Sequence, residues 1–167
     1  MTKVLRSSLA SIPLVACMCA VALADWEPPG KWSLAERQQW TELRNEALTY
    51  LKDANAHCGT TIELDFDFES FRGKFKDGEK YGLDAYGRAH TAATIYAVDN
   101  ICKIGDREKR AVAASIKKIK VTHGRKGGDA KSSISYANKT LYPVIEPAGS
   151  AAGSWQDELE RWIKTKL

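Results

Sequence analysis

The chain is poor in the residues that most often carry catalytic or metal-binding chemistry. Of its 167 residues, four are cysteine, three are histidine and two are methionine. The sequence contains no C-x-x-C pair, no H-x-x-x-H or H-E-x-x-H pair and no G-x-S-x-G motif. It therefore gives no support for a thiol oxidoreductase, a zinc protease or a common secreted serine hydrolase. We expect neither a metal ion nor a cofactor.

Long apolar runs are also scarce. The run from Leu9 to Leu23 has 15 residues, fewer than the roughly 20 that a membrane-spanning helix needs. Lys3 and Arg6 precede it, and Ala24 ends the small-x-small motif that closes it. This is the pattern of a cleavable secretory signal peptide. No second run of spanning length follows, so we expect no transmembrane segment in the mature chain.

The cleavage site sets the expected domain boundaries. We predict that residues 1–24 are removed after Ala24 and that residues 25–167 form one secreted or periplasmic domain. A lipoprotein signal is the alternative, because the four residues ending at Cys17 resemble a bacterial lipobox. In that case Cys17 would carry a lipid and anchor the protein. The apolar run continues past Cys17, however, which favours cleavage after Ala24.

Charge is nearly balanced over the mature chain but unevenly distributed. Without the signal peptide, 23 basic and 21 acidic residues leave a net charge of +2. Residues 25–102 contain 9 Lys/Arg and 14 Asp/Glu, whereas residues 103–131 contain 10 Lys/Arg and 3 Asp/Glu. Such a basic segment can bind an anionic partner, or it can complement an acidic face within the same fold. We do not expect nucleic acid as a partner, and the oligomeric state does not follow from the sequence.

Two cysteines remain after export. Cys17 and Cys19 leave with the signal peptide, so Cys58 and Cys102 have a single intramolecular pairing available in an oxidising compartment. We therefore predict a Cys58–Cys102 disulfide. In the chain-entropy model, closing a loop of this length stabilises a fold by about 4 kcal/mol.

Hydrophobic periodicity predicts helices and strands along the whole mature chain. A capping box formed by Ser33 and Glu36 begins the first helix, which Gly59 ends. Ser154 is expected to cap the last helix. The expected helices are 33–58, 84–103, one whose apolar face is formed by Val112, Ile116 and Ile119, and 154–167. The expected strands are 60–69, 119–123, 134–136 and 141–145.

The order of these elements predicts the fold class. We expect a small single α+β domain, with amphipathic helices on one face of an antiparallel sheet of about four strands and with one disulfide. The last three strands are expected to form a meander with a tight turn at Asn138-Lys139. Pro143 lacks the N–H that a sheet ladder needs, so it predicts that the last strand is an edge or bulged strand.

The leading functional hypothesis rests on a basic, glycine-rich loop. Arg125, Lys126 and Lys131 lie in this loop and could hold an anionic group. We expect a non-enzymatic domain that binds a protein or an anionic polymer in the cell envelope or outside the cell. Binding is expected through the loop and the adjoining edge strand, where β-augmentation could occur.

The alternative hypothesis is an enzyme. Glu63, Asp65, Asp67 and Glu69 alternate along the predicted first strand. Paired carboxylates can act as the acid and the base of a small cell-envelope hydrolase. Two carboxylates facing each other in a cleft would favour this hypothesis, whereas a flat exposed row would not.

Overall fold

The computed structural model describes residues 32–71, 83–124, 133–145 and 152–167, which hold five helices and four strands. The helices are α1 (Leu34–Cys58), α2 (Phe68–Phe71), α3 (Leu83–Ile104), α4 (Asp106–Ser115) and α5 (Ala152–Lys166). The strands are β1 (Glu63–Phe66), β2 (Lys118–His123), β3 (Ser133–Ala137) and β4 (Thr140–Ile145).

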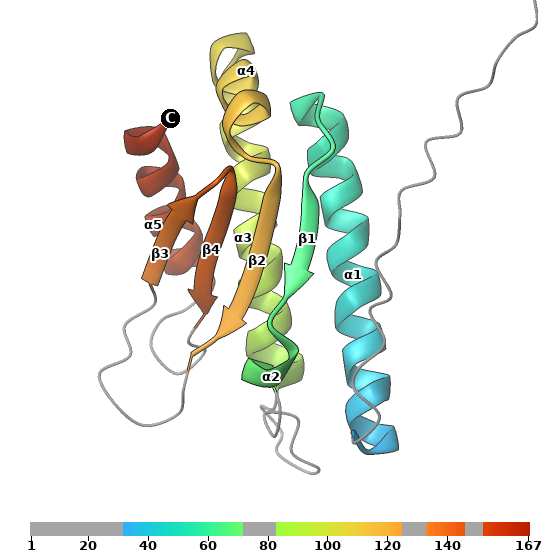
Figure 1. Cartoon of the computed structure of the whole chain (residues 1–167). Coiled ribbons are helices and arrows are strands. Elements are labelled where there is room, and N and C mark those ends of the chain that lie inside the picture. The colour runs from blue at the N-terminus through green and yellow to red at the C-terminus, as the bar shows by residue number, and fades with distance from the viewer. Residues whose placement is uncertain (1–31, 72–82, 125–132, 146–151) are drawn as a thin grey trace, which may run out of the picture.

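The elements form two layers. The helices α1, α3 and α5 lie behind one face of the sheet, with α3 packed between the other two (Figure 1). The short α2 and the helix α4 lie at opposite ends of the sheet, and none of the described helices crosses its front (Figure 1). The expected α+β class, the four strands and the disulfide are confirmed.

The sheet is mixed, so the expected antiparallel sheet and meander are wrong. Its strand order is β1-β2-β4-β3, in which β1–β2 and β2–β4 are parallel and only β3–β4 is antiparallel. Because α3 and α4 form a crossover between β1 and β2, the chain returns in the same direction and the two strands pair in parallel. The hairpin then folds β4 back between β2 and β3.

The tight turn expected at Asn138-Lys139 is confirmed. Both residues have positive φ, 50° and 59°, as the type I′ turn of a two-residue hairpin requires. Ala137 pairs with Thr140 directly across this turn. In such a hairpin the flanking pair is hydrogen-bonded, and the bonded pairs then alternate along the two strands.

Pro143 lies in an interior strand, so the expected edge position is wrong. This alternation makes its pairing with Ile134 of β3 a non-hydrogen-bonded one, which turns the nitrogen of Pro143 toward β2. The pairing of β2 with β4 is interrupted there and resumes at Val144. The sheet therefore accommodates a missing N–H by a local gap in one ladder, and its edges are β1 and β3.

Alternation along the strands sends one set of side chains into the core between the layers. These sheet residues are Leu64, Phe66, Ile119, Val121, Leu141 and Ile145, each at most 4% exposed. The helices meet them with large side chains that are equally buried. The main ones are Trp40 and Leu43 of α1, Ile95 and Val98 of α3, and Trp155, Leu159 and Ile163 of α5.

Helix ends follow the local signals in α1 but not in α5. The Ser33 capping box is present, and Gly59 ends α1 with a φ of 62°. In contrast, α5 begins at Ala152, so Ser154 lies inside its first turn and is not its cap. The buried indole of Trp155 donates to the Thr94 hydroxyl at 3.0 Å, and packing of this kind overrides weak local preferences.

Candidate functional site

The basic residues predicted to bind an anion are Arg125, Lys126 and Lys131, and all three lie outside the described residues. They belong to the connection that leaves β2 and enters β3. Their role stays a prediction.

The acidic row is divided between two elements, so the expected strand through Glu69 is wrong. β1 ends at Phe66, and Glu69 lies in α2. Asp65 accepts the Phe66 N–H at 2.8 Å and forms an ion pair with Lys118 at 3.1 Å. The Asp67 carboxylate accepts a hydrogen bond from the backbone N–H of Ser70 at 3.4 Å. A bond of this kind favours the start of a helix over the continuation of a strand. Both carboxylates therefore serve local structure.

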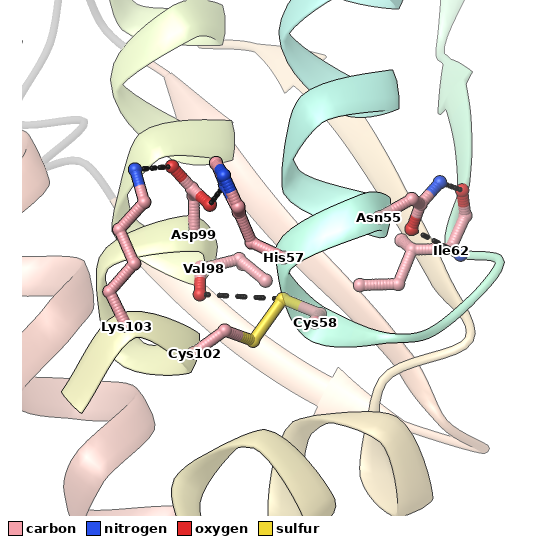
Figure 2. Close-up of a disulfide and its surroundings, with 8 residues drawn as sticks. All are labelled: Asn55, His57, Cys58, Ile62, Val98, Asp99, Cys102 and Lys103. Carbon is pink, nitrogen blue, oxygen red and sulfur yellow. Dashed lines mark hydrogen bonds and ion pairs between the residues drawn. A yellow bond between two sulfur atoms is a disulfide. The ribbon is translucent and has the colours of Figure 1, made fainter. Parts of the chain in front are cut away.

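The disulfide joins the end of α1 to the C-terminal part of α3. Figure 2 shows the bond between the two helices. Cys58 and Cys102 are each 2% exposed, with their Cα atoms 5.1 Å apart. A buried disulfide fits a protein that folds in an oxidising compartment. Of the helices in the described ranges, none is both long and apolar enough to cross a membrane.

Beside the disulfide, one buried carboxylate holds two basic side chains (Figure 2). Asp99 is 4% exposed; its two oxygens lie 2.8 Å from His57 Nδ1 and 2.5 Å from Lys103 Nζ. A carboxylate can orient a histidine for general base catalysis or for a metal. The described part of the chain, however, holds no group of three or more ligand-type side chains for a metal ion. The cluster instead links the C-terminal ends of α1 and α3, where positive charge is favourable.

A shallow surface depression between α1 and α3, which we call the dent, is lined in part by the ionisable side chains of Glu46, Tyr50 and Arg88. Tyr50 donates a hydrogen bond to Glu46 at 2.8 Å, which together with Tyr96 raises the pKa of Tyr50 to about 12. Arg88 lies 3.7 Å from the carboxylates of both Glu42 and Glu46. The dent is open to solvent and has essentially no interior volume for even a water molecule, whereas usual ligand pockets hold roughly 300 Å³ or more. It is therefore too small to be a ligand site.

The front of the sheet, which none of the described helices covers (Figure 1) and which we call the open face, carries a mostly polar set of side chains. They alternate with the buried residues along each strand, and each of them is partly or fully exposed. The open face consists of Glu63 and Asp65 of β1, Lys118, Lys120 and Thr122 of β2, Thr140, Tyr142 and Val144 of β4, and Ser135 and Ala137 of β3.

Lys120 and Tyr142 occupy the centre of the open face. Lys120 pairs with Asp65 on β1, and Tyr142 pairs with Ser135 on β3. The β2–β4 pairs on either side have the same offset, so Lys120 and Tyr142 lie side by side. Unlike Lys118, which is bound to Asp65, neither the Lys120 ammonium nor the Tyr142 hydroxyl has a hydrogen-bond or ion-pair partner among the described residues.

Sequence reasoning missed this site because it had the wrong strand order. Alternation in the two segments predicts which of their side chains are exposed. The expected meander, however, would place β3 between β2 and β4 and would separate Lys120 from Tyr142. Only the observed order, with β4 beside β2, brings the two side chains together.

Over the described residues, fold and site define a two-layer α+β domain with the Cys58–Cys102 disulfide and the open face of its sheet. Comparisons with protein-family models, with curated proteins and with solved structures find no match for the chain. The open face is therefore interpreted from its own chemistry.

Proposed function

We propose that this chain is an exported, non-enzymatic binding domain that holds an anionic polysaccharide on the open face of its sheet. The observation that carries the proposal is the adjacent pair Lys120 and Tyr142, whose polar ends have no partner among the described residues. The buried disulfide supports export, since it needs an oxidising compartment to form.

The chemistry of the open face suits a charged sugar chain. The Lys120 ammonium, which has no partner within the described ranges, can bind the carboxylate of a uronic acid. The ring of Tyr142 combines an apolar face, on which a sugar can stack, with a hydroxyl that can bond to it. Thr122, Thr140 and Ser135 surround the pair with hydroxyls that both donate and accept. An extended, shallow sheet face fits a chain better than a small molecule, which needs a concave pocket.

The test measures binding of the mature protein to polygalacturonate, with neutral dextran as the control polymer, by affinity electrophoresis. We expect retardation by polygalacturonate alone, weakening as salt is added. Lys120→Glu and Tyr142→Ala should each lower the affinity by about tenfold or more. Lys164→Glu makes the same charge change on α5, behind the sheet, and should leave binding unchanged.

Two outcomes would refute the proposal. If neither polymer retards the folded protein, the open face does not bind this class of ligand. If K164E weakens binding as much as K120E does, the attraction depends on overall charge and not on the open face.

The basic loop requires a separate experiment. Charge reversal at Arg125 and Lys126 is predicted to weaken binding further, because the loop joins β2 to β3. Unchanged binding in a folded double variant would remove these two residues from the proposal and leave Lys120 and Tyr142 as its basis.

A further inference from the structure

The two edges of the sheet differ in whether side chains bond to their outward main-chain groups. At the β1 edge, the Asn55 side chain bonds to both the N–H and the C=O of Ile62, at 2.8 and 3.0 Å (Figure 2). The Phe66 N–H is taken by Asp65. Side chains thus occupy main-chain groups that another strand would need, which is a common protection of sheet edges.

The β3 edge has no such protection in the part of the chain that the structure describes. Its five residues, Ser133 to Ala137, include no proline and no charged side chain. Hydrogen bonding to β4 uses Ser133, Ser135 and Ala137, so the main-chain groups of Ile134 and Tyr136 point away from the sheet. No hydrogen bond to these outward groups is present among the described residues.

Helix α5, which lies behind this edge, carries a row of three side chains that could pair with the same row of a second copy. Tyr136 of β3 lies against Trp162 of α5, with ring centroids 6.5 Å apart. Glu158 lies one turn before Trp162 and Lys166 one turn after it, and both are exposed. These three residues form a stripe along α5 in the order acidic (Glu158), aromatic (Trp162) and basic (Lys166). Such an order is complementary to itself when two copies run antiparallel.

We propose that β3 is the interface of a symmetric dimer, in which it pairs antiparallel with β3 of a second copy. A twofold axis at Ser135 sets Ile134 opposite Tyr136 of the other copy, so that the outward groups exchange two hydrogen bonds at each of the two sites. The same axis brings Glu158 near Lys166 of the other α5, with the two Trp162 rings between. The two sheets become one, and their open faces become continuous.

This proposal does not depend on the proposed function. A dimer would present two copies of the Lys120–Tyr142 pair to one polymer chain. A domain that binds no polysaccharide could still form the dimer, and a monomer could still bind, so the two proposals fail separately.

The first test is register-specific cross-linking of the mature protein. Ser135 would face its own copy as a non-hydrogen-bonded pair, with Cα atoms about 4.5 Å apart, which a disulfide can bridge. Ser135→Cys should therefore give a covalent dimer under mild oxidation. Ala137→Cys is the control on the same exposed strand: it would face Ser133 of the second copy and should not cross-link.

The second test uses sedimentation velocity over a concentration series. The unmodified protein should sediment as a dimer, and Glu158→Lys should raise the dimer dissociation constant by about tenfold or more, because lysines then face lysines. Adding Lys166→Glu to this variant should restore the dimer. Asp157→Lys makes the same charge change off the stripe and should have no effect.

The proposal is overturned by a monomer throughout the concentration series, or by equal cross-linking of the two cysteine variants. A dimer that E158K weakens but that the double exchange does not restore would also refute the predicted antiparallel arrangement of α5.

Discussion

At Tyr50, a phenol donates to the carboxylate of Glu46. Loss of the phenol proton would break this hydrogen bond and place two negative charges side by side, so the pKa of Tyr50 rises to about 12. An unfolded tyrosine titrates near pH 10. The contribution to stability is therefore complete below about pH 10 and is lost as the pH rises through about 12.

A tyrosinate absorbance titration checks this prediction. The difference between the unmodified protein and Tyr50→Phe should show one group that titrates near pH 12. Glu46→Gln removes the charged acceptor and should move that titration toward pH 10. A difference curve centred at pH 10 in the unmodified protein would contradict the prediction.

Single residues also show where the sequence was sufficient and where it was not. The Cys58–Cys102 pair was predictable, because the predicted removal of the signal peptide leaves two cysteines with one pairing. The contact of His57 with Asp99 was not, because the residues are 42 positions apart and neither lies in a recognisable motif. Their meeting depends on how α1 packs against α3.

Among the elements, the β3–β4 hairpin carries a local strain that can be relieved. Lys139 has a φ of 59°, a conformation that glycine adopts at little cost and other residues do not. Lys139→Gly should therefore raise the free energy of unfolding by about 0.5 to 1 kcal/mol, since Asn-Gly is a favoured type I′ turn. Urea denaturation measures the change.

Lys117→Gly is the matched control for the hairpin. Lys117 is also exposed but does not have a positive φ. Glycine there adds freedom to the unfolded chain without relieving strain, so stability should fall. If both variants are destabilised alike, strain at Lys139 is not significant.

The elements could be predicted in part because their signals are local. The capping box begins α1, alternation identifies the buried residues of β1 and β2, and Asn138-Lys139 forms the turn. Strand order could not be predicted in this way, because the local patterns in residues 118–145 indicate where the strands lie but not which of them pair with each other. Pro143 was misleading, since an interior strand can tolerate it where the ladder has a gap.

For the whole molecule, the disulfide is expected to be a major source of stability. Its cysteines are 44 residues apart in sequence. The double variant Cys58→Ser, Cys102→Ser should lower the free energy of unfolding by about 4 kcal/mol, because its unfolded chain is no longer restricted by the closed loop. Denaturation of both proteins without reductant measures the difference; a loss below about 1 kcal/mol would contradict the prediction.

The same bond changes how the molecule responds to a pulling force. The loop between Cys58 and Cys102 contains β1, α2 and most of α3, so tension applied at the two chain ends bypasses these elements. At about 3.4 Å for each extended residue, the oxidised chain should lengthen by about 150 Å less than the reduced one when it is stretched. A domain that holds a polymer under shear would thus keep one edge of its sheet covalently shielded from the load.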